Sequence, residues 1–293
     1  MNIKNTNSLK NFTEDLQGEY TKKSQDEIIR ELLSLVSKLD FFKIKYGDSA
    51  VKGSKLNRSD YIVICIDEIL KVAAVNMWNI CIKNGAIYLY NGQYWEQIEK
   101  PKFQNFLGRA AIKSGIEVNT AKYYAFKEQL YSQFVSAAYL EPPTANKGTT
   151  LINLLNGTFE ITPQKQILRP FNAKDFLTHQ LPFKYDPEAK APIFKKFLDE
   201  VLTDKTKQEV LAEYLGYIFI NPSVLKLEKV LILYGSGANG KSVVFEIVSA
   251  LLGRENISGY SLQSLTNDNG YYRAKIGDKL LNYASELNGK MET

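Results

Sequence analysis

One short glycine-rich stretch of the 293-residue sequence has the residue types and spacing of a phosphate-binding loop. Residues 235–242 read Gly-Ser-Gly-Ala-Asn-Gly-Lys-Ser, which fits the pattern G-x-x-x-x-G-K-S. Glycine carries no Cβ and tolerates positive φ, so the backbone N–H groups of such a loop can approach a phosphate closely. We therefore predict that ATP and Mg²⁺ bind to Gly235, Ser236, Gly237, Ala238, Asn239, Gly240, Lys241 and Ser242.

Two side chains of this loop and one acid beyond it would carry the chemistry. The amine of Lys241 would reach the β- and γ-phosphates, and the hydroxyl of Ser242 would ligate Mg²⁺. Hydrolysis also needs an acid at the end of a second strand, which holds Mg²⁺ through water and orients the attacking water. The run Lys-Leu-Leu-Asn-Tyr-Ala-Ser-Glu at residues 279–286 supplies Glu286 for both tasks. A surface glutamate at a strand end remains the alternative.

Other residues capable of chemistry have simpler explanations. Asp67 and Glu68 also follow an apolar run, but the pattern continues as a helix, which places both acids in solvent. His179 is the single histidine, which excludes a histidine-rich metal site and favours a structural hydrogen bond in a loop. Cys65 and Cys81 lie in apolar stretches and provide neither a disulfide framework nor a zinc-ligand spacing.

A cluster of aromatic residues has two interpretations. These side chains could stack on the bases of single-stranded DNA, because lysines follow them in the sequence. Cross-strand pairs that stabilise a small sheet explain the same residues and are the favoured interpretation. The residues are Tyr88, Tyr90, Tyr94 and Trp95.

The elements that would position the loop can be predicted from the sequence around it. Apolar residues 230–234 predict a strand before the loop, and an amphipathic helix follows it and ends at Gly253. At the other end of the chain, Ser24 and Glu27 form a capping box for a helix. Further helices are predicted over 60–82, 102–139, 192–202 and 206–220, and strands within 85–98, on both sides of Asn91-Gly92, and over 151–161.

Bulk properties indicate an ordinary globular protein. The sequence is 44% hydrophobic and 24% charged, with 37 Lys and Arg against 32 Asp and Glu, a mild basic surplus that permits nucleic-acid binding. The N-terminal residues lack the apolar core of a signal peptide, and no segment is apolar for the roughly 18 residues of a membrane span. We therefore expect a soluble, cytoplasmic protein with no membrane partner.

The loop and its surroundings resemble one family, the superfamily 3 helicases of phage and plasmid primase-helicases, which include the poxvirus primase-helicase. Asn239 directly before Gly-Lys is similar to the family's form of the loop, and residues 261–287 are similar to its connecting segment and Walker B strand. Similar segments lie upstream at residues 88–95, 151–161, 177–202 and 211–219. Within 261–287, the matching positions are Leu262, Leu265, Arg273, Gly277, Lys279, Asn282 and Glu286.

The resemblance implies an ATP-driven helicase that assembles as a homohexamer and moves along single-stranded DNA or replication-fork DNA. Family members continue beyond Walker B with a polar sensor, a basic DNA-contacting loop and an arginine finger, whereas this sequence ends at Thr293. We therefore expect a member truncated after Walker B. Because an arginine finger contributes about 10³ to 10⁵ in rate, the chain alone should hydrolyse ATP slowly.

The expected fold is an incomplete α/β P-loop NTPase core preceded by a mainly α-helical domain with a small β element. The expected division is a polar tail over 1–24, a mainly helical domain with a β-hairpin over 25–143, a helical domain over 144–224 and the core over 225–293. Two rival functions remain open: a non-catalytic DNA- or partner-binding remnant of such a protein, and an ATPase or kinase of another P-loop lineage.

Overall fold

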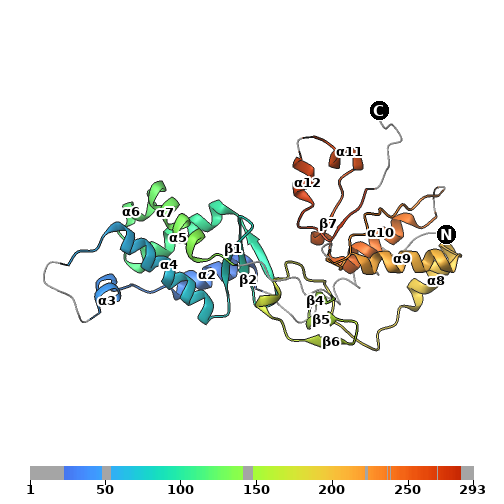
Figure 1. Ribbon diagram of the computed structural model, residues 1–293, viewed down its shortest axis with the longest axis horizontal. Helices are drawn as coiled ribbons and strands as arrows, with labels where there is room; N and C mark the ends of the chain where they lie inside the picture. The colour runs from blue at the N-terminus through green and yellow to red at the C-terminus, as the bar shows by residue number, and fades with distance from the viewer. Residues whose placement is uncertain are drawn as a thin grey trace. The chain divides into compact units, whose positions relative to one another are not determined.

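The described part of the chain forms two compact units (Figure 1). The computed structural model describes residues 23–47, 54–140, 148–221, 224–235, 237, 239–268 and 270–284. The N-terminal unit lies within Thr21–Thr144 and takes in the short segment Asn172–Phe176, while the C-terminal unit lies within Ala145–Phe171 and Leu177–Thr293. The polar tail expected over 1–24 lies almost wholly outside the described residues, and the four-part division stays a prediction.

Helices build most of the N-terminal unit. The capping box predicted at its first helix is confirmed: the Ser24 N–H donates to Glu27 Oε2 at 2.6 Å, and the Glu27 N–H donates to Ser24 Oγ at 3.3 Å. The predicted helical region over 102–139 is also confirmed, as three helices. The described α-helices are α2 (Gln25–Leu35), α3 (Phe41–Tyr46), α4 (Arg58–Val75), α5 (Lys100–Ser114), α6 (Val118–Lys122) and α7 (Tyr124–Ala137).

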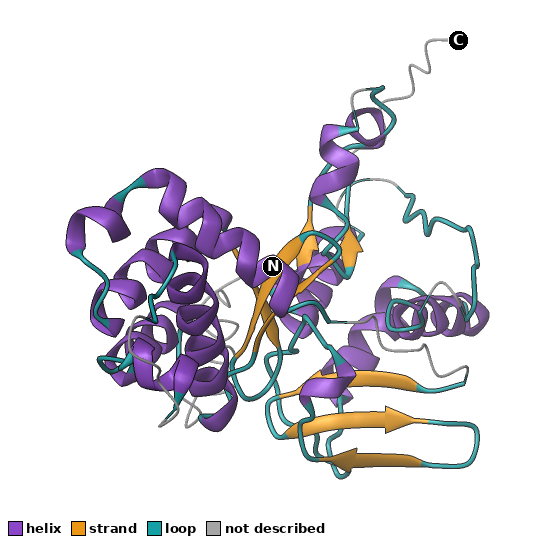
Figure 2. Ribbon diagram, turned by 60° about the vertical axis from the view of Figure 1, so that its left-hand side comes forward, coloured by secondary structure: helices purple, strands orange, loops and turns teal. Residues whose placement is uncertain are grey.

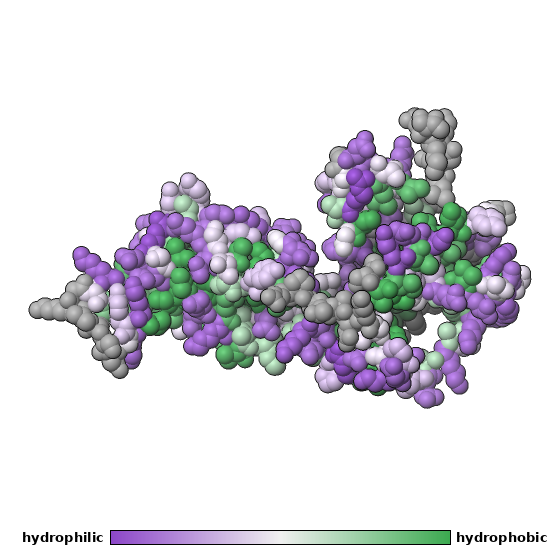
Figure 3. Space-filling model, in the orientation of Figure 1, coloured by the Kyte–Doolittle hydropathy of each residue, from purple (hydrophilic) through white to green (hydrophobic). Residues whose placement is uncertain are grey.

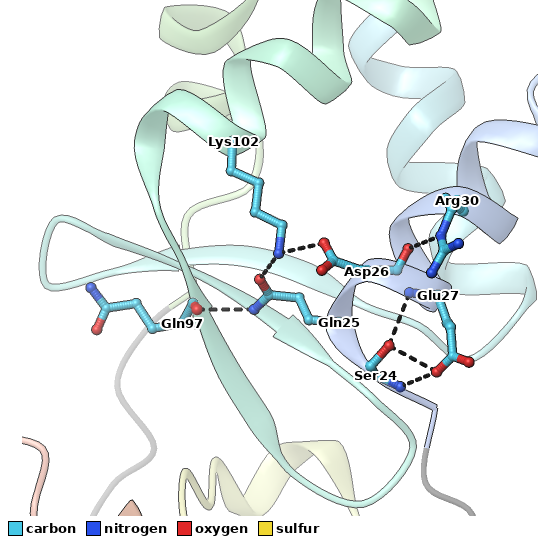
Figure 4. Close-up of polar contacts among 7 residues, drawn as sticks. All are labelled: Ser24, Gln25, Asp26, Glu27, Arg30, Gln97 and Lys102. Atoms are coloured by element: carbon cyan, nitrogen blue, oxygen red, sulfur yellow. Dashed lines mark hydrogen bonds and ion pairs between the residues drawn. The ribbon is translucent and has the colours of Figure 1, made fainter.

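Polar contacts fix α2 against α5 and the small sheet (Figure 4). Lys102 Nζ, from α5, lies 2.7 Å from Asp26 Oδ1 and donates to Gln25 Oε1 at 2.7 Å. Gln25 in turn donates from Nε2 to the carbonyl of Gln97 at 3.0 Å. The Lys102 ammonium holds the pKa of the Asp26 carboxyl below its ordinary value.

A three-stranded antiparallel sheet accompanies these helices (Figure 2). The predicted strands on both sides of Asn91-Gly92 are confirmed as β2 (Ala86–Tyr90) and β3 (Trp95–Ile98), which place Tyr90 opposite Trp95. The helix predicted over 60–82 is too long, because α4 ends at Val75 and the next apolar residues form β1 (Ile80–Lys83), which pairs with β2.

The core of the N-terminal unit explains why its helices pack as they do. Phe126, Leu130 and Phe134 repeat along one face of α7, and all three are buried. The Phe134 ring lies 4.5 Å from the ring of Phe103 on α5, measured between centroids. On α4, Ile66 and Ile69 belong to the same cluster. The helices of this unit therefore share one apolar core.

The aromatic residues of the sheet pack against the returning segment Asn172–Phe176. Trp95 is 4% exposed, and its indole Nε1 donates to the carbonyl of Ala173 at 2.8 Å. The Phe176 ring stacks on Trp95 at 5.1 Å, and the Tyr88 ring meets Phe176 edge-on at 5.0 Å. The Tyr90 ring is 5.3 Å from Trp95, so packing within the sheet and onto Phe176 accounts for Tyr88, Tyr90 and Trp95.

The C-terminal unit mixes a second sheet with helices. The strand predicted over 151–161 is a hairpin that a third strand extends, and both predicted helices after Pro192 are confirmed with shorter ends. Its described elements are β4 (Thr150–Leu154), β5 (Gly157–Ile161), β6 (Gln166–Arg169), α8 (Pro192–Val201), α9 (Lys205–Tyr217), α10 (Lys241–Leu252), β7 (Ile257–Ser258), α11 (Leu262–Leu265), α12 (Tyr271–Lys275) and β8 (Leu281–Asn282).

The strand predicted over 230–234 does not form in the described structure. A strand needs a hydrogen-bonded neighbour, and β7 and β8 pair in parallel only with each other. Val230, Ile232 and Tyr234 are consequently exposed, and Figure 3 shows hydrophobic surface in this unit. The chain thus contains an α-rich unit with a small β element and a second, mixed unit, while the P-loop NTPase core stays a prediction.

None of the helices in the described ranges is long and apolar enough to cross a membrane.

Candidate nucleotide-binding site

Backbone conformation makes two glycines of the loop difficult to replace. Gly240 has φ of +87° and is the N-cap of α10, where a Cβ would lie 3.0 Å from Val201 Cγ1 and 3.1 Å from Phe197 Cζ. Gly235 has φ of +154°, and a Cβ there would collide with the side-chain amide of Asn239. Gly237 has open space around its Cα. Ser236 and Ala238 lie outside the described residues.

The Lys241 amine is held within the loop. Its Nζ donates to Asn239 Oδ1 at 2.7 Å and to the carbonyl of Gly235 at 3.1 Å. A phosphate would offer the amine stronger, charged acceptors than these neutral oxygens. The N-terminal end of α10 carries the partial positive charge of the helix dipole at the same place. The loop therefore brings a cation and a helix terminus together.

Ser242 is exposed on the first turn of α10, next to Lys241. The remainder of the helix is fixed by its apolar face, because Val244, Val248 and Leu252 are buried and pack with Leu154 of β4. Gly253 ends α10 with φ of +86°, as the sequence predicts. The helix that carries Lys241 and Ser242 is thus anchored to the sheet of its own unit.

Asn256, which follows α10 in the chain, also holds the end of this helix in place. Its Nδ2 donates to the carbonyls of Leu252 at 2.7 Å and Gln180 at 3.2 Å. Gln180 in turn donates to the carbonyl of Leu154 at 3.2 Å. Both amides are buried, so their bonds satisfy groups that would otherwise be costly to leave unpaired.

The predicted acid Glu286 lies outside the described residues, but the strand before it is present as β8. Asn282 accepts from Ser258 Oγ at 2.8 Å and from the Tyr260 N–H at 2.9 Å, which fixes β8 beside β7. The ring of Tyr283 stacks on Phe245 of α10 with centroids 4.1 Å apart. The chain that leads towards Glu286 therefore runs against the helix that starts at the loop.

His179 has the structural hydrogen bond expected for a loop histidine. Its Nε2 lies 2.6 Å from the carbonyl oxygen of Asp278, which can only accept, so Nε2 carries the proton. Its Nδ1 then accepts from the Thr178 hydroxyl at 3.2 Å. Burial lowers the pKa of His179 below its ordinary value, which keeps the ring neutral.

The remaining candidates from the sequence do not join this site. Asp67 is exposed on α4, and Glu68 lies 3.7 Å from Lys71 one turn later, as expected for a helix surface. Cys65 and Cys81 are buried free thiols, and burial raises the pKa of each to about 12. Across the described residues, no group of three or more His, Cys, Asp or Glu side chains could hold a metal ion.

Sequence reasoning missed the residues that shape the loop from outside. Phe197 and Val201 of α8 approach Gly240, although they are about forty residues away along the chain. In the sequence, Phe197 and Val201 can be recognised only as residues on the apolar face of an amphipathic helix. That pattern does not predict which part of the protein the face packs against.

Comparison with known proteins relates part of the chain to a family model. A family model described as "D5 N terminal like" matches residues 68–203. This match supports a relationship to the D5-type primase-helicases of phages and viruses. It ends before the glycine-rich loop, so it bears on the family and not on nucleotide binding. No curated protein matches the chain.

Proposed function

We propose that this chain, with its D5 N terminal like region, is an ATP-dependent DNA helicase of the phage or plasmid replication type. It would bind ATP with Mg²⁺ at the glycine-rich loop and couple hydrolysis to movement on single-stranded DNA. The observation that carries the proposal is the loop itself, in which Lys241 Nζ lies among loop oxygens at the start of α10. The superfamily 3 assignment and a homohexameric assembly belong to the same proposal.

The chain's own residues would divide the work. Gly235 and Gly240 let the backbone wrap a phosphate, and Lys241 would exchange its bonds to Gly235 and Asn239 for bonds to the β- and γ-phosphates. Mg²⁺, when bound, would neutralise charge that develops on the phosphates, with Ser242 as a ligand. Glu286 would orient the attacking water.

Titration calorimetry with ATP and Mg²⁺ tests the nucleotide site. A charge-assisted hydrogen bond contributes about 1.5–3 kcal/mol, so Lys241→Ala should weaken binding by roughly 10- to 100-fold. Lys190→Ala is the matched control, because Lys190 is an exposed lysine of the same unit outside the loop, and it should leave binding unchanged. Ser242→Ala should weaken binding with Mg²⁺ present and have little effect in EDTA.

Absence of ATP binding by the unsubstituted chain would refute the nucleotide site. The region matched at residues 68–203 would then be best explained as a DNA- or partner-binding module without catalysis. Binding that survives Lys241→Ala would equally exclude the proposed role of that lysine.

A further inference from the structure

Two neighbouring tyrosines on the N-terminal unit have no role in its core. Tyr123 is 51% exposed and Tyr124 is 73% exposed, at the point where α6 ends and α7 begins. Their ring centroids are 4.9 Å apart and the ring planes meet at 66°. The buried face of α7 is built by other residues, so folding of the unit does not explain why aromatic rings occupy this turn.

Two lysines flank this turn along the chain, and an arginine packs against the first turn of α7. Lys122 directly precedes the tyrosines, and Lys127 lies one helical turn after them, with its aliphatic stem beside Gly108 of α5. Arg58 comes from the start of α4, more than sixty residues earlier, and its guanidinium lies 5.4 Å from the ring centroid of Phe126 in the first turn of α7. We call Arg58, Lys122, Tyr123, Tyr124 and Lys127 the tyrosine patch.

The acidic residues near the patch in the sequence form contacts with other groups. Glu117 accepts from the N–H groups of Asn119 and Thr120 at 2.9 and 2.7 Å, which caps α6. Glu128 pairs with Lys100 at 2.9 Å.

Asp60, two residues after Arg58, pairs with Lys45 at 2.6 Å and accepts from the Asn57 N–H at 2.7 Å. Across the described ranges, no acidic side chain pairs with Arg58, Lys122 or Lys127. The patch therefore carries an uncompensated positive charge.

We propose that the tyrosine patch binds single-stranded nucleic acid, with unpaired bases stacked on the rings of Tyr123 and Tyr124. Exposed aromatic rings accept the face of any base, and adjacent cations contact the phosphates that join successive nucleotides. Because the two rings are tilted, a base on one ring cannot continue as a straight stack on the other, so the strand bends at this turn. Bases inside a duplex are stacked on their neighbours and have no free face, so the patch should bind a single strand in preference to a duplex.

The ligand class follows from the proposed function, but the site is separate from the nucleotide loop. Binding at the patch does not require bound ATP, and none of the patch residues lies in the C-terminal unit. The two proposals can therefore fail independently of each other.

Fluorescence anisotropy with a labelled oligothymidine of about 20 nucleotides tests the patch in the full chain. Each stacked base contributes about fivefold to 150-fold in affinity, so Tyr123→Ala with Tyr124→Ala should weaken binding by at least about 30-fold. Tyr139→Ala is the matched control, because Tyr139 is 65% exposed on the same unit and lies outside the patch. Phenylalanine at both positions keeps the ring faces and should restore affinity.

Salt dependence separates stacking from charge. Replacing Arg58, Lys122 or Lys127 by Gln should reduce the slope of log affinity against log salt by about 0.7 for each phosphate that the variant no longer neutralises, whereas the tyrosine substitutions should leave the slope unchanged. Thermal melting of each variant checks that the unit still folds.

Three results would overturn the inference: no binding of oligothymidine by the unsubstituted chain, equal affinity for duplex, or an affinity of the double alanine variant that matches Tyr139→Ala. If Lys241→Ala abolishes ATP binding while the double alanine variant keeps its oligonucleotide affinity, only this inference fails. If the chain binds oligonucleotide through the patch but binds no ATP, only the nucleotide-site proposal fails.

Discussion

Gly240→Ala should destabilise the C-terminal unit far more than the same change at Gly237. The new methyl group would sit 3.0 Å from Val201 Cγ1 and 3.1 Å from Phe197 Cζ, and the backbone would have to keep φ at +87°. A left-handed conformation costs a residue with a Cβ about 1–2 kcal/mol, and overpacking costs about 1–3 kcal/mol. The free energy of unfolding should therefore fall by about 2–5 kcal/mol.

Gly237→Ala provides the comparison within the same loop. Its Cβ would meet no atom within 4 Å, so the folded state gains no clash. Alanine also restricts the unfolded chain more than glycine does. The expected change is no larger than about 0.5 kcal/mol in the destabilising direction.

Urea unfolding can follow the two units separately. Trp78 and Trp95 are the two tryptophans of the chain and both lie in the N-terminal unit, so their fluorescence reports that unit. Circular dichroism reports the helices of both. Gly240→Ala should move the circular dichroism transition to lower urea and leave the tryptophan transition in place.

A double variant separates the steric part of the lost stability from the part caused by the positive φ. Adding Val201→Ala to Gly240→Ala removes the closest steric contact but not the positive φ, so part of the stability should return relative to Val201→Ala alone. If Gly240→Ala and Gly237→Ala unfold at the same urea concentration, the geometry assigned to the start of α10 is wrong.

Two further predictions concern buried titratable groups. Burial holds the pKa of His179 below its ordinary value of 6.5. Between the lowered pKa and 6.5, His179 is protonated in the unfolded chain and neutral in the folded chain. The free energy of unfolding should therefore fall as the pH drops below about 6.5. Urea midpoints between about pH 5 and pH 7 should show this fall, and His179→Gln should flatten it; an equally steep fall in the variant would refute the assignment. Burial raises the pKa of Cys65 and Cys81 to about 12, so neither thiol should react with DTNB at about pH 8 until urea unfolds the N-terminal unit. Rapid reaction of either thiol in the folded chain would contradict its burial.

Local signals in the sequence predicted local structure well. The Ser24 and Glu27 capping box, the turn at Asn91-Gly92 and the end of α10 at Gly253 each depend on residues a few positions apart, and each is present. Such features are decided by short-range hydrogen bonds and by φ preferences that the residue types carry with them.

Features that depend on distant partners could not be predicted in this way. The apolar residues of β1 are compatible with both helix and strand, and only pairing with β2 decides between them. Conversely, residues 230–234 have strand-like composition but no strand pairs with them in the described structure. At the candidate site, the loop pattern identifies Lys241, but the approach of Phe197 to Gly240 depends on tertiary packing.

The segment Asn172–Phe176 limits how this protein can be divided or recombined. A fragment that ends at Thr144 would keep every described α-helix of the N-terminal unit but lose the Ala173 carbonyl and the Phe176 ring that cover Trp95. Its exposed indole would be a site for aggregation. Because the unit is built from two separate segments, any exchange of residues 21–144 alone would also have to match the Asn172–Phe176 segment that covers Trp95.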